Sequence, residues 1–220
     1  MSNQKLKFSI RPYEFKDSNA VNQLCKKSIE ALCASNYNSQ QVEALASLYH
    51  RESDGKQVEV IDNIFSFVNT LIPTDLAKPN AIVAHLEDHL IGYASIRNSW
   101  ISNDSLLAQL FVDPEYARRG VATELLRTLE NNVMDESKVV TIGATLTGEP
   151  FYQANGYQTI EQYSSFIGGV RIPFVHMEKW LTTPWEIEKF FWDTSRQGMR
   201  NIEWLATETE ALLRSAFNEG

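Results

Sequence analysis

The chain has 220 residues, of which 43% are hydrophobic and 22% are charged, and its formal net charge is −8. Such a chain can bury a sizeable core, and its acidic balance argues against a general nucleic-acid binder, which needs a basic face. The same balance is compatible with cationic partners. The first residues lack the apolar core of a signal peptide and no apolar run is long enough to span a bilayer, so we expect no leader and no membrane segment.

The only cysteines are Cys25 and Cys33. They lie on one predicted helix, where their spacing separates the two Cα atoms by about 12 Å at 1.5 Å per residue. That distance is too long for a disulfide, so we expect two buried thiols and a cytoplasmic protein. No set of cysteine, histidine and carboxylate residues has the spacing of metal ligands, and we expect no metal.

The N-terminal part of the chain is predicted to form one strand followed by helices. Residues 6–12 alternate between apolar and polar side chains, as in a strand. Apolar residues at helical spacing then predict a helix near 18–34 and a second helix that carries Val42 and Tyr49. A third amphipathic helix is predicted within 56–72.

Two hairpins and two further strands follow. The apolar runs 81–86 and 90–96 form the first hairpin, and residues 163–178 form the second around a Gly-Gly pair. Residues 105–113 and 139–145 are predicted as single strands. Three histidines in or near the hairpins are interpreted as surface or structural residues: His85, His89 and His176.

The last part of the chain contains two amphipathic helices rich in aromatic residues, predicted within 184–217. Their apolar faces must be covered by the rest of the chain or by a second chain, so a homodimer through these helices is one possible arrangement. We therefore divide the chain into a domain of residues 1–181 and a C-terminal helical extension of residues 182–220.

The stretch 106–126 is the most informative part of the sequence. An apolar run of strand length stops at Asp113, and apolar residues recur at helical spacing after Gly120. The first amides of a helix have no internal partners and carry partial positive charge, and a glycine lets a ligand approach the backbone. With Arg118 and Arg119 before the glycine, the stretch is typical of a phosphate site. An ordinary strand-to-helix turn with solvated arginines is the alternative.

The pattern V-D-P-x-x-x-R-R-G-V-A over 112–122 resembles the pyrophosphate-binding segment of the GNAT superfamily of acyl-CoA-dependent N-acyltransferases. A second stretch, P-F-Y-Q-A-N-G-Y over 150–157, is similar to the segment that follows the fifth strand in that superfamily. The resemblance covers residues 6–181. It implies an α+β fold of three layers, with a mixed, mostly antiparallel central sheet of about seven strands flanked by helices. The C-terminal helical pair would be an addition to that fold.

The resemblance also implies acetyl-CoA as the acyl donor, bound in a split between the fourth and fifth strands. The pantetheine arm would pair with backbone of the fourth strand at Leu110, Phe111 and Val112. The diphosphate would be held by Arg118, Arg119, Gly120, Val121, Ala122 and Thr123. By position, Tyr152 is the general acid for the leaving thiolate, with core packing as the alternative, and Phe151 packs the helix or lines the cofactor slot.

In this superfamily the loop and helices after the first strand form a wall of the acceptor site, which implies Glu30 and Tyr37 as substrate-binding candidates. A structural role is the alternative for each. The helix predicted within 56–72 would be a lid over the acceptor site or a wall beside it, or it would merely cover the sheet. On the fourth strand, Leu106 and Ala108 occupy the positions where some members place a base, and neither can take a proton. Gln109 is polar but would face the opposite side by strand alternation. We therefore expect the acceptor to be deprotonated through water or by Glu30.

Together these features favour an N-acetyltransferase that transfers the acetyl group of acetyl-CoA to an amine, in a small molecule or in a peptide or protein, by direct attack in a ternary complex. The acidic composition favours a cationic amine. A non-catalytic acyl-CoA sensor or partner-binding domain on the same fold is a second interpretation, motivated by the missing strand base. An acyltransferase with a longer acyl group or an oxygen acceptor is a third. We expect no metal, nucleic-acid or membrane partner.

Overall fold

The computed structural model describes residues 6–49, 80–98 and 104–181. The chain divides after Leu181, and all described residues belong to the first unit, Met1–Leu181. The helix predicted within 56–72 and the helical pair predicted within 184–217 lie outside the described residues. Their roles, the homodimer and the domain boundary therefore stay predictions.

Seven strands of the described residues form one sheet in the order β1-β2-β3-β4-β5-β7-β6. Neighbouring strands are antiparallel except β4 and β5, which are parallel. The strands are β1 Ser9–Pro12, β2 Asn80–Leu86, β3 His89–Asn98, β4 Asp104–Val112, β5 Val139–Thr145, β6 Gln158–Ile167 and β7 Val170–Trp180. The α-helices are α1 Ser18–Leu32, α2 Ser39–Ser47, α4 Val121–Val133 and α5 Glu149–Ala154. This mixed, mostly antiparallel sheet with flanking helices confirms the predicted fold class.

Within the described residues, the predicted elements have the correct type and differ mainly at their ends. The strand predicted at 139–145 is β5, residue for residue. The first helix ends earlier than the predicted 18–34, since the chain tightens into a 3₁₀ turn from Cys33. Cys25 and Cys33 are both buried free thiols, as expected. Among the helices of the described residues, none is both long enough and apolar enough to cross a bilayer.

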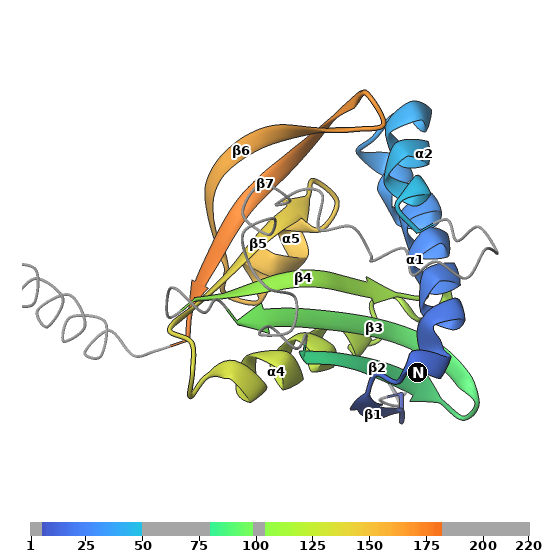
Figure 1. Cartoon of the computed structure of the whole chain (residues 1–220), viewed down its shortest axis with the longest axis vertical. Helices are drawn as coiled ribbons and strands as arrows, with labels where there is room; N and C mark the ends of the chain where they lie inside the picture. Colours follow the sequence, from blue (N-terminus) through green and yellow to red (C-terminus); the bar gives the residue numbers. More distant parts are fainter. Residues whose placement is uncertain (1–5, 50–79, 99–103, 182–220) are drawn as a thin grey trace, which may run out of the picture. The chain divides into compact units, whose positions relative to one another are not determined.

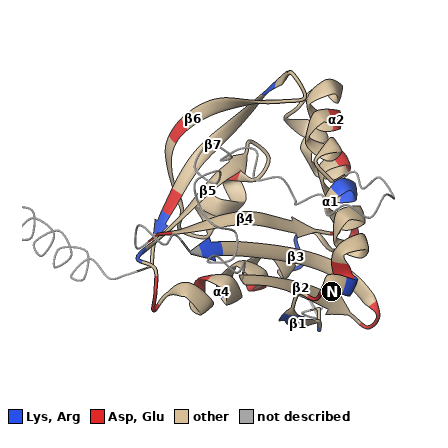
Figure 2. Ribbon diagram, in the orientation of Figure 1, with Lys and Arg blue, Asp and Glu red and all other residues tan. Residues whose placement is uncertain are grey.

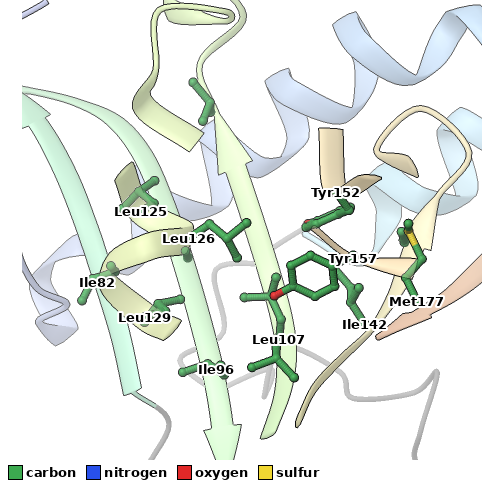
Figure 3. Close-up of a cluster of buried hydrophobic side chains, with 14 of the residues drawn as sticks. Ile82, Ile96, Leu107, Leu125, Leu126, Leu129, Ile142, Tyr152, Tyr157 and Met177 are labelled. Carbon is green, nitrogen blue, oxygen red and sulfur yellow. The ribbon is translucent and has the colours of Figure 1, made fainter. Parts of the chain in front are cut away.

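Helices cover both faces of the sheet (Figure 1). On the face that we call the α4 face, α4 packs on β2, β3 and β4 with an apolar stripe that is almost fully buried. Figure 3 shows Leu125, Leu126 and Leu129 of this stripe beside Ile82 of β2 and Ile96 of β3. This contact forms the main hydrophobic core and fixes the direction of α4.

The opposite face, which we call the α1–α2 face, is covered by the first two helices. Leu24 and Cys25 of α1 pack against Val83 of β2 and Tyr93 of β3. A second cluster joins α2 to the β6–β7 hairpin. The hairpin turns at Gly168 and Gly169, whose φ angles of 55° and 80° suit the two-residue turn that its Gly-Gly pair predicts.

Within the described residues, β4 and β5 are paired over three residues and then separate. The last pair joins Leu106 and Thr141, whereas β4 continues to Val112 and β5 to Thr145. Figure 1 shows the two strands leaving a common start and running apart. We call the unpaired stretches 107–112 and 142–145 the β4–β5 split.

A β-bulge lies where the split begins. On β3, Ser95 pairs with Gln109 and Ile96 pairs with Leu107, so Ala108 has no partner. A bulge bends its strand and increases the local twist, which turns β4 away from β5. The bulge also changes which side chains of β4 face which layer of helices.

Candidate active site

The unpaired edge of β4 is the first component of the candidate site. From residue 107 to residue 112 this strand pairs with β3 on one side and, among the described residues, with no strand on the other. An extended ligand can pair with such an edge as an additional strand, using main-chain hydrogen bonds. Leu110, Phe111 and Val112, the residues predicted to bind the pantetheine arm, all lie on this stretch.

The loop after β4 turns sharply into α4. Arg118 and Gly120 have positive φ angles of 59° and 88°, and α4 begins directly after the glycine. Among the described residues, no atom lies within 4 Å of the point where a side chain of Gly120 would begin. The backbone N–H groups of residues 118–123 make no hydrogen bond to another described residue. Exposed donors at the positive end of a helix form an anion site, so this loop has the shape and charge to hold a phosphate group.

The start of α4 lies close to the sheet because β3 carries a glycine there. A Cβ atom on Gly92 would be 2.8 Å from Cδ1 of Leu125 and 3.0 Å from Cγ1 of Val121. Both residues are buried and belong to the first turns of α4. Because Gly92 has no side chain, the start of α4 can lie close to the sheet. This close approach fixes the position of the free amides of α4.

Ion pairs connect the loop to α1. Nζ of Lys27 lies 3.0 Å from both carboxylate oxygens of Asp113 and 2.9 Å from Oε1 of Glu115. Asp113 also accepts a hydrogen bond from the backbone N–H of Glu115. The guanidinium of Arg119 lies 5.7 Å from the ring centroid of Tyr116, a cation–π contact. The acidic groups of the loop are thus paired with a lysine, while its arginines stay exposed.

Tyr152 lies on α5, beside the split. Its ring packs edge to face on Phe151 and Tyr157, with centroid distances of 5.1 Å and 5.5 Å. Figure 3 places Tyr152 and Tyr157 near Ile142 of β5. The Tyr152 hydroxyl makes no hydrogen bond to a described residue, and burial raises its pKa. The phenol therefore keeps its proton at neutral pH, which a general acid requires and which a core tyrosine would also do.

The two residues predicted to bind the acceptor line one cavity of about 680 Å³ between α1 and α2. Glu30 is exposed there, with its carboxylate 3.9 Å from Nζ of Lys26. The Tyr37 hydroxyl donates to the carbonyl of Pro173 at 2.7 Å and accepts from the N–H of Leu146 at 2.8 Å. Burial raises the pKa of Tyr37 to about 12. Because backbone groups occupy its hydroxyl, Tyr37 can offer a ligand mainly its ring.

Gln109 faces the α1–α2 layer, and the expectation from simple alternation is wrong. Its Oε1 accepts a hydrogen bond of 3.2 Å from Ser95 Oγ, and its Nε2 lies 3.4 Å from the Tyr49 hydroxyl. The unpaired Ala108 shifts the alternation by one residue, so Gln109 points to the same face as Leu106.

Sequence reasoning also missed a contact on β7. Nε2 of His176 lies 3.5 Å from Oε1 of Glu178, and both side chains are less than a third exposed. The two residues are two positions apart, so they share a face of the strand. Phe174, which has the same parity, packs in the α2 cluster, so this face is the α1–α2 face. The i, i+2 spacing of a histidine and a carboxylate on a predicted strand was the available signal.

Comparison with known proteins identifies the family of this chain. The sequence profile of the acetyltransferase (GNAT) domain matches residues 33–181. The chain belongs to the GNAT acetyltransferase family. It is 30% identical over 153 residues to an uncharacterized N-acetyltransferase, YafP, of Escherichia coli K12, a match that covers 70% of this chain and 83% of that protein. The resemblance inferred from the two motifs is therefore confirmed.

Solved structures show the same GNAT fold. A GCN5-related N-acetyltransferase from Rhodopseudomonas palustris superposes with a TM-score of 0.60 at 25% identity, over 78% of this chain and 94% of that one. The PaiA N-acetyltransferase of Thermoplasma acidophilum, solved in complex with coenzyme A, has a TM-score of 0.56 at 18% identity, over 79% and 99% of the two chains. GNAT enzymes use acetyl-CoA and act on an amine acceptor.

Proposed function

We propose that this GNAT protein is an N-acetyltransferase that transfers the acetyl group of acetyl-CoA to an amine by direct attack. The observation that supports it most is the position of the free amides of residues 118–123 directly beyond the unpaired edge of β4. A ligand with a diphosphate at one end and an extended amide-containing arm matches this combination. Neither the helix start nor the strand edge alone would select such a ligand.

In this proposal each part has one task. Arg118, Arg119 and the amides from Gly120 to Thr123 hold the diphosphate. The backbone of Leu110, Phe111 and Val112 pairs with the pantetheine arm, and one N–H of this stretch stabilises the oxyanion that forms when the amine attacks. Phe151 borders the arm, and Tyr152 gives its proton to the departing thiolate.

The acceptor approaches from the α1–α2 face, because core side chains of α4 and α5 fill the other face of the sheet. Glu30 and Tyr37 contact the part of the acceptor away from the reacting nitrogen, since they line the cavity between the two helices. The negative charge of Glu30 favours a cationic amine.

Two measurements on the full chain test this function. Titration calorimetry with acetyl-CoA and with CoA should show saturable binding, and thiol release from acetyl-CoA should depend on an added amine from a panel of alkylamines, diamines and peptide N-termini. Tight binding without amine-dependent release would instead favour the acyl-CoA sensor, which the lack of a proton-accepting side chain at Leu106, Ala108 and Gln109 also suggests. No binding would remove both functions.

A further inference from the structure

The register of the sheet brings His176 to the level of the split. Gly143 of β5 pairs with His176 of β7, two positions beyond the last β4–β5 pair at Thr141. The bulged Ala108 and Gln109 lie at the matching height on β4, two and three positions beyond Leu106. A row across the α1–α2 face therefore runs from Gln109, over the split and Gly143, to His176.

Gly143 is the position of this row that carries no side chain. The pairs on either side carry a side chain on β5, Thr141 against Glu178 and Thr145 against Phe174. Position 143 has none, so β5 places no side chain between the imidazole of His176 and the split. The His176 side chain is 29% exposed, so it is partly open to solvent on this face.

Carboxylates flank the imidazole on two sides. Glu178 lies on the same face of β7, and Glu161 of β6 pairs directly with His176. Figure 2 shows the acidic segments on β6 and β7 in red. On this face, β5 contributes no ionisable group, and the described residues of β4 nearest the row, Leu106 and Gln109, are not ionisable either.

Other titratable groups border the row from farther positions on the same face. Arg97 and Tyr93 belong to β3 and Tyr49 follows α2. Tyr163 of β6 and Tyr37 lie on the β6–β7 side, where burial is the main cause that raises the pKa of each hydroxyl. Histidine is the side chain in this group whose ordinary pKa is closest to neutral.

We propose that His176 is the general base that removes a proton from the acceptor ammonium, and that Glu178 is a positioning residue that orients the imidazole. This inference rests on the proposed function and adds the proton acceptor that β4 lacks. The imidazole takes one proton from the ammonium, directly or through one water, and releases it to solvent. The neutral nitrogen then forms the C–N bond while the C–S bond breaks. The nitrogen loses a second proton as the thiolate gains one, so an ammonium and a thioester give an amide, a thiol and one proton.

The pH dependence of thiol release identifies the base. We expect kcat/KM, measured with acetyl-CoA and two panel amines of different pKa, to decrease at low pH. The midpoint of this decrease, which we call the acid limb, should be the same for both amines. His176→Gln should lower kcat/KM about 10²- to 10⁴-fold and remove this limb. Added imidazole should restore part of the rate to His176→Ala. CoA affinity from calorimetry should stay unchanged in both variants, since no part of the CoA site is altered.

Matched variants separate His176 from other groups. Glu178→Gln should lower kcat/KM less than His176→Gln and keep the limb, because the imidazole remains and only the group that orients it is changed. Neither the exposed His89→Gln nor Glu30→Gln should move the limb.

The inference is overturned if the limb persists in His176→Gln, if it follows the pKa of the amine, or if Glu30→Gln removes it. In each of these cases thiol release still depends on the amine, so the proposed N-acetyltransferase function stands. CoA binding without release on any amine would instead contradict the proposed function and, with it, this base.

Discussion

The hydroxyl of Tyr157 donates a hydrogen bond of 3.0 Å to Oε1 of Glu130, a carboxylate of α4 in a residue that is only 8% exposed. The second oxygen of that carboxylate accepts a hydrogen bond of 2.6 Å from Nζ of Lys179 on β7. On the α4 face, the cluster joins three parts of the chain: α4, the residue before β6, and the end of β7. Since the Tyr157 ring also touches Tyr152, the cluster supports one wall of the candidate site.

Tyr157→Phe should lower the free energy of unfolding by about 1.5–3 kcal/mol, because it removes a hydrogen bond to a buried charged acceptor and leaves that oxygen without its donor. Urea denaturation measures the loss. Tyr163→Phe is the matched control, since the buried Tyr163 hydroxyl has no hydrogen-bond partner among the described residues. That variant should keep or slightly raise stability. Equal losses in the two variants would show that the Glu130 hydrogen bond is not the cause.

Replacing both Arg118 and Arg119 by glutamine should weaken CoA binding by about tenfold or more, because two exposed positive charges beside the free amides of α4 are lost, and each 1.4 kcal/mol is a factor of ten. The salt dependence of the dissociation constant should also decrease. Calorimetry at two salt concentrations measures both effects. Arg127→Gln is the control, since Arg127 lies farther along α4 and pairs with Glu124 at 3.0 Å. An equal effect in the control would point to net charge alone.

Gly92→Ala should weaken CoA binding as well as stability, because the new methyl group displaces Val121 and Leu125 and lifts the first turns of α4 from the sheet. Overpacking of this kind costs about 1–3 kcal/mol of stability. Gly169→Ala is the control. An alanine at this position is strained because the φ angle is 80°, and the position lies in the β6–β7 turn and not beside α4. It should lose about 1 kcal/mol of stability and keep its CoA affinity. If Gly92→Ala binds CoA with unchanged affinity, the distance between α4 and the sheet does not determine CoA binding.

Tyr152→Phe should lower kcat about 10²-fold or more and leave CoA affinity and stability close to those of the parent protein. The ring keeps its contacts with Phe151 and Tyr157, and only a hydroxyl without a hydrogen-bond partner among the described residues is removed. Steady-state kinetics with a saturating amine measures the effect. Full kcat in this variant would assign Tyr152 to the core alone.

Protonation of His85 should destabilise the protein below neutral pH. Its Nε2 lies 3.1 Å from Nη2 of Arg11, and a guanidinium only donates, so the imidazole must be neutral. Burial, followed by the charge of Arg11, lowers the pKa of His85. The contribution to stability is complete above the ordinary value of about 6.5 and is lost as the pH falls from there through the lowered pKa.

Unfolding free energies measured between about pH 8 and about pH 5 test this prediction. Stability should decrease with falling pH in the parent protein and less steeply in His85→Gln. The exposed His89→Gln should follow the parent. A slope that is unchanged in His85→Gln would assign the acid sensitivity to other groups.

The features that could be predicted from the sequence are those set by local patterns. The strand over 139–145 was found because its short segment is rich in β-branched residues. The turn into α4 was found because Gly120 and the helical spacing after it lie on one segment. The bulge at Ala108 could not be found this way, since it exists only in the pairing with β3. The position of His176 beside the split could not be predicted either, because it depends on how β7 pairs with β5.

Deleting Ala108 should make the pairing of β3 with β4 regular and leave the facing of the neighbouring side chains unchanged. Leu107 already pairs with Ile96 and Gln109 already pairs with Ser95, so the loss of the unpaired residue removes no pair. Because successive residues of a regular strand point to opposite faces, Gln109 would stay on the α1–α2 face and Leu107 on the α4 face. The deletion would remove the extra twist of the bulge, so β4 would run straighter beside β5. A relative whose fourth strand is one residue shorter at this point would therefore have a narrower gap for an extended ligand.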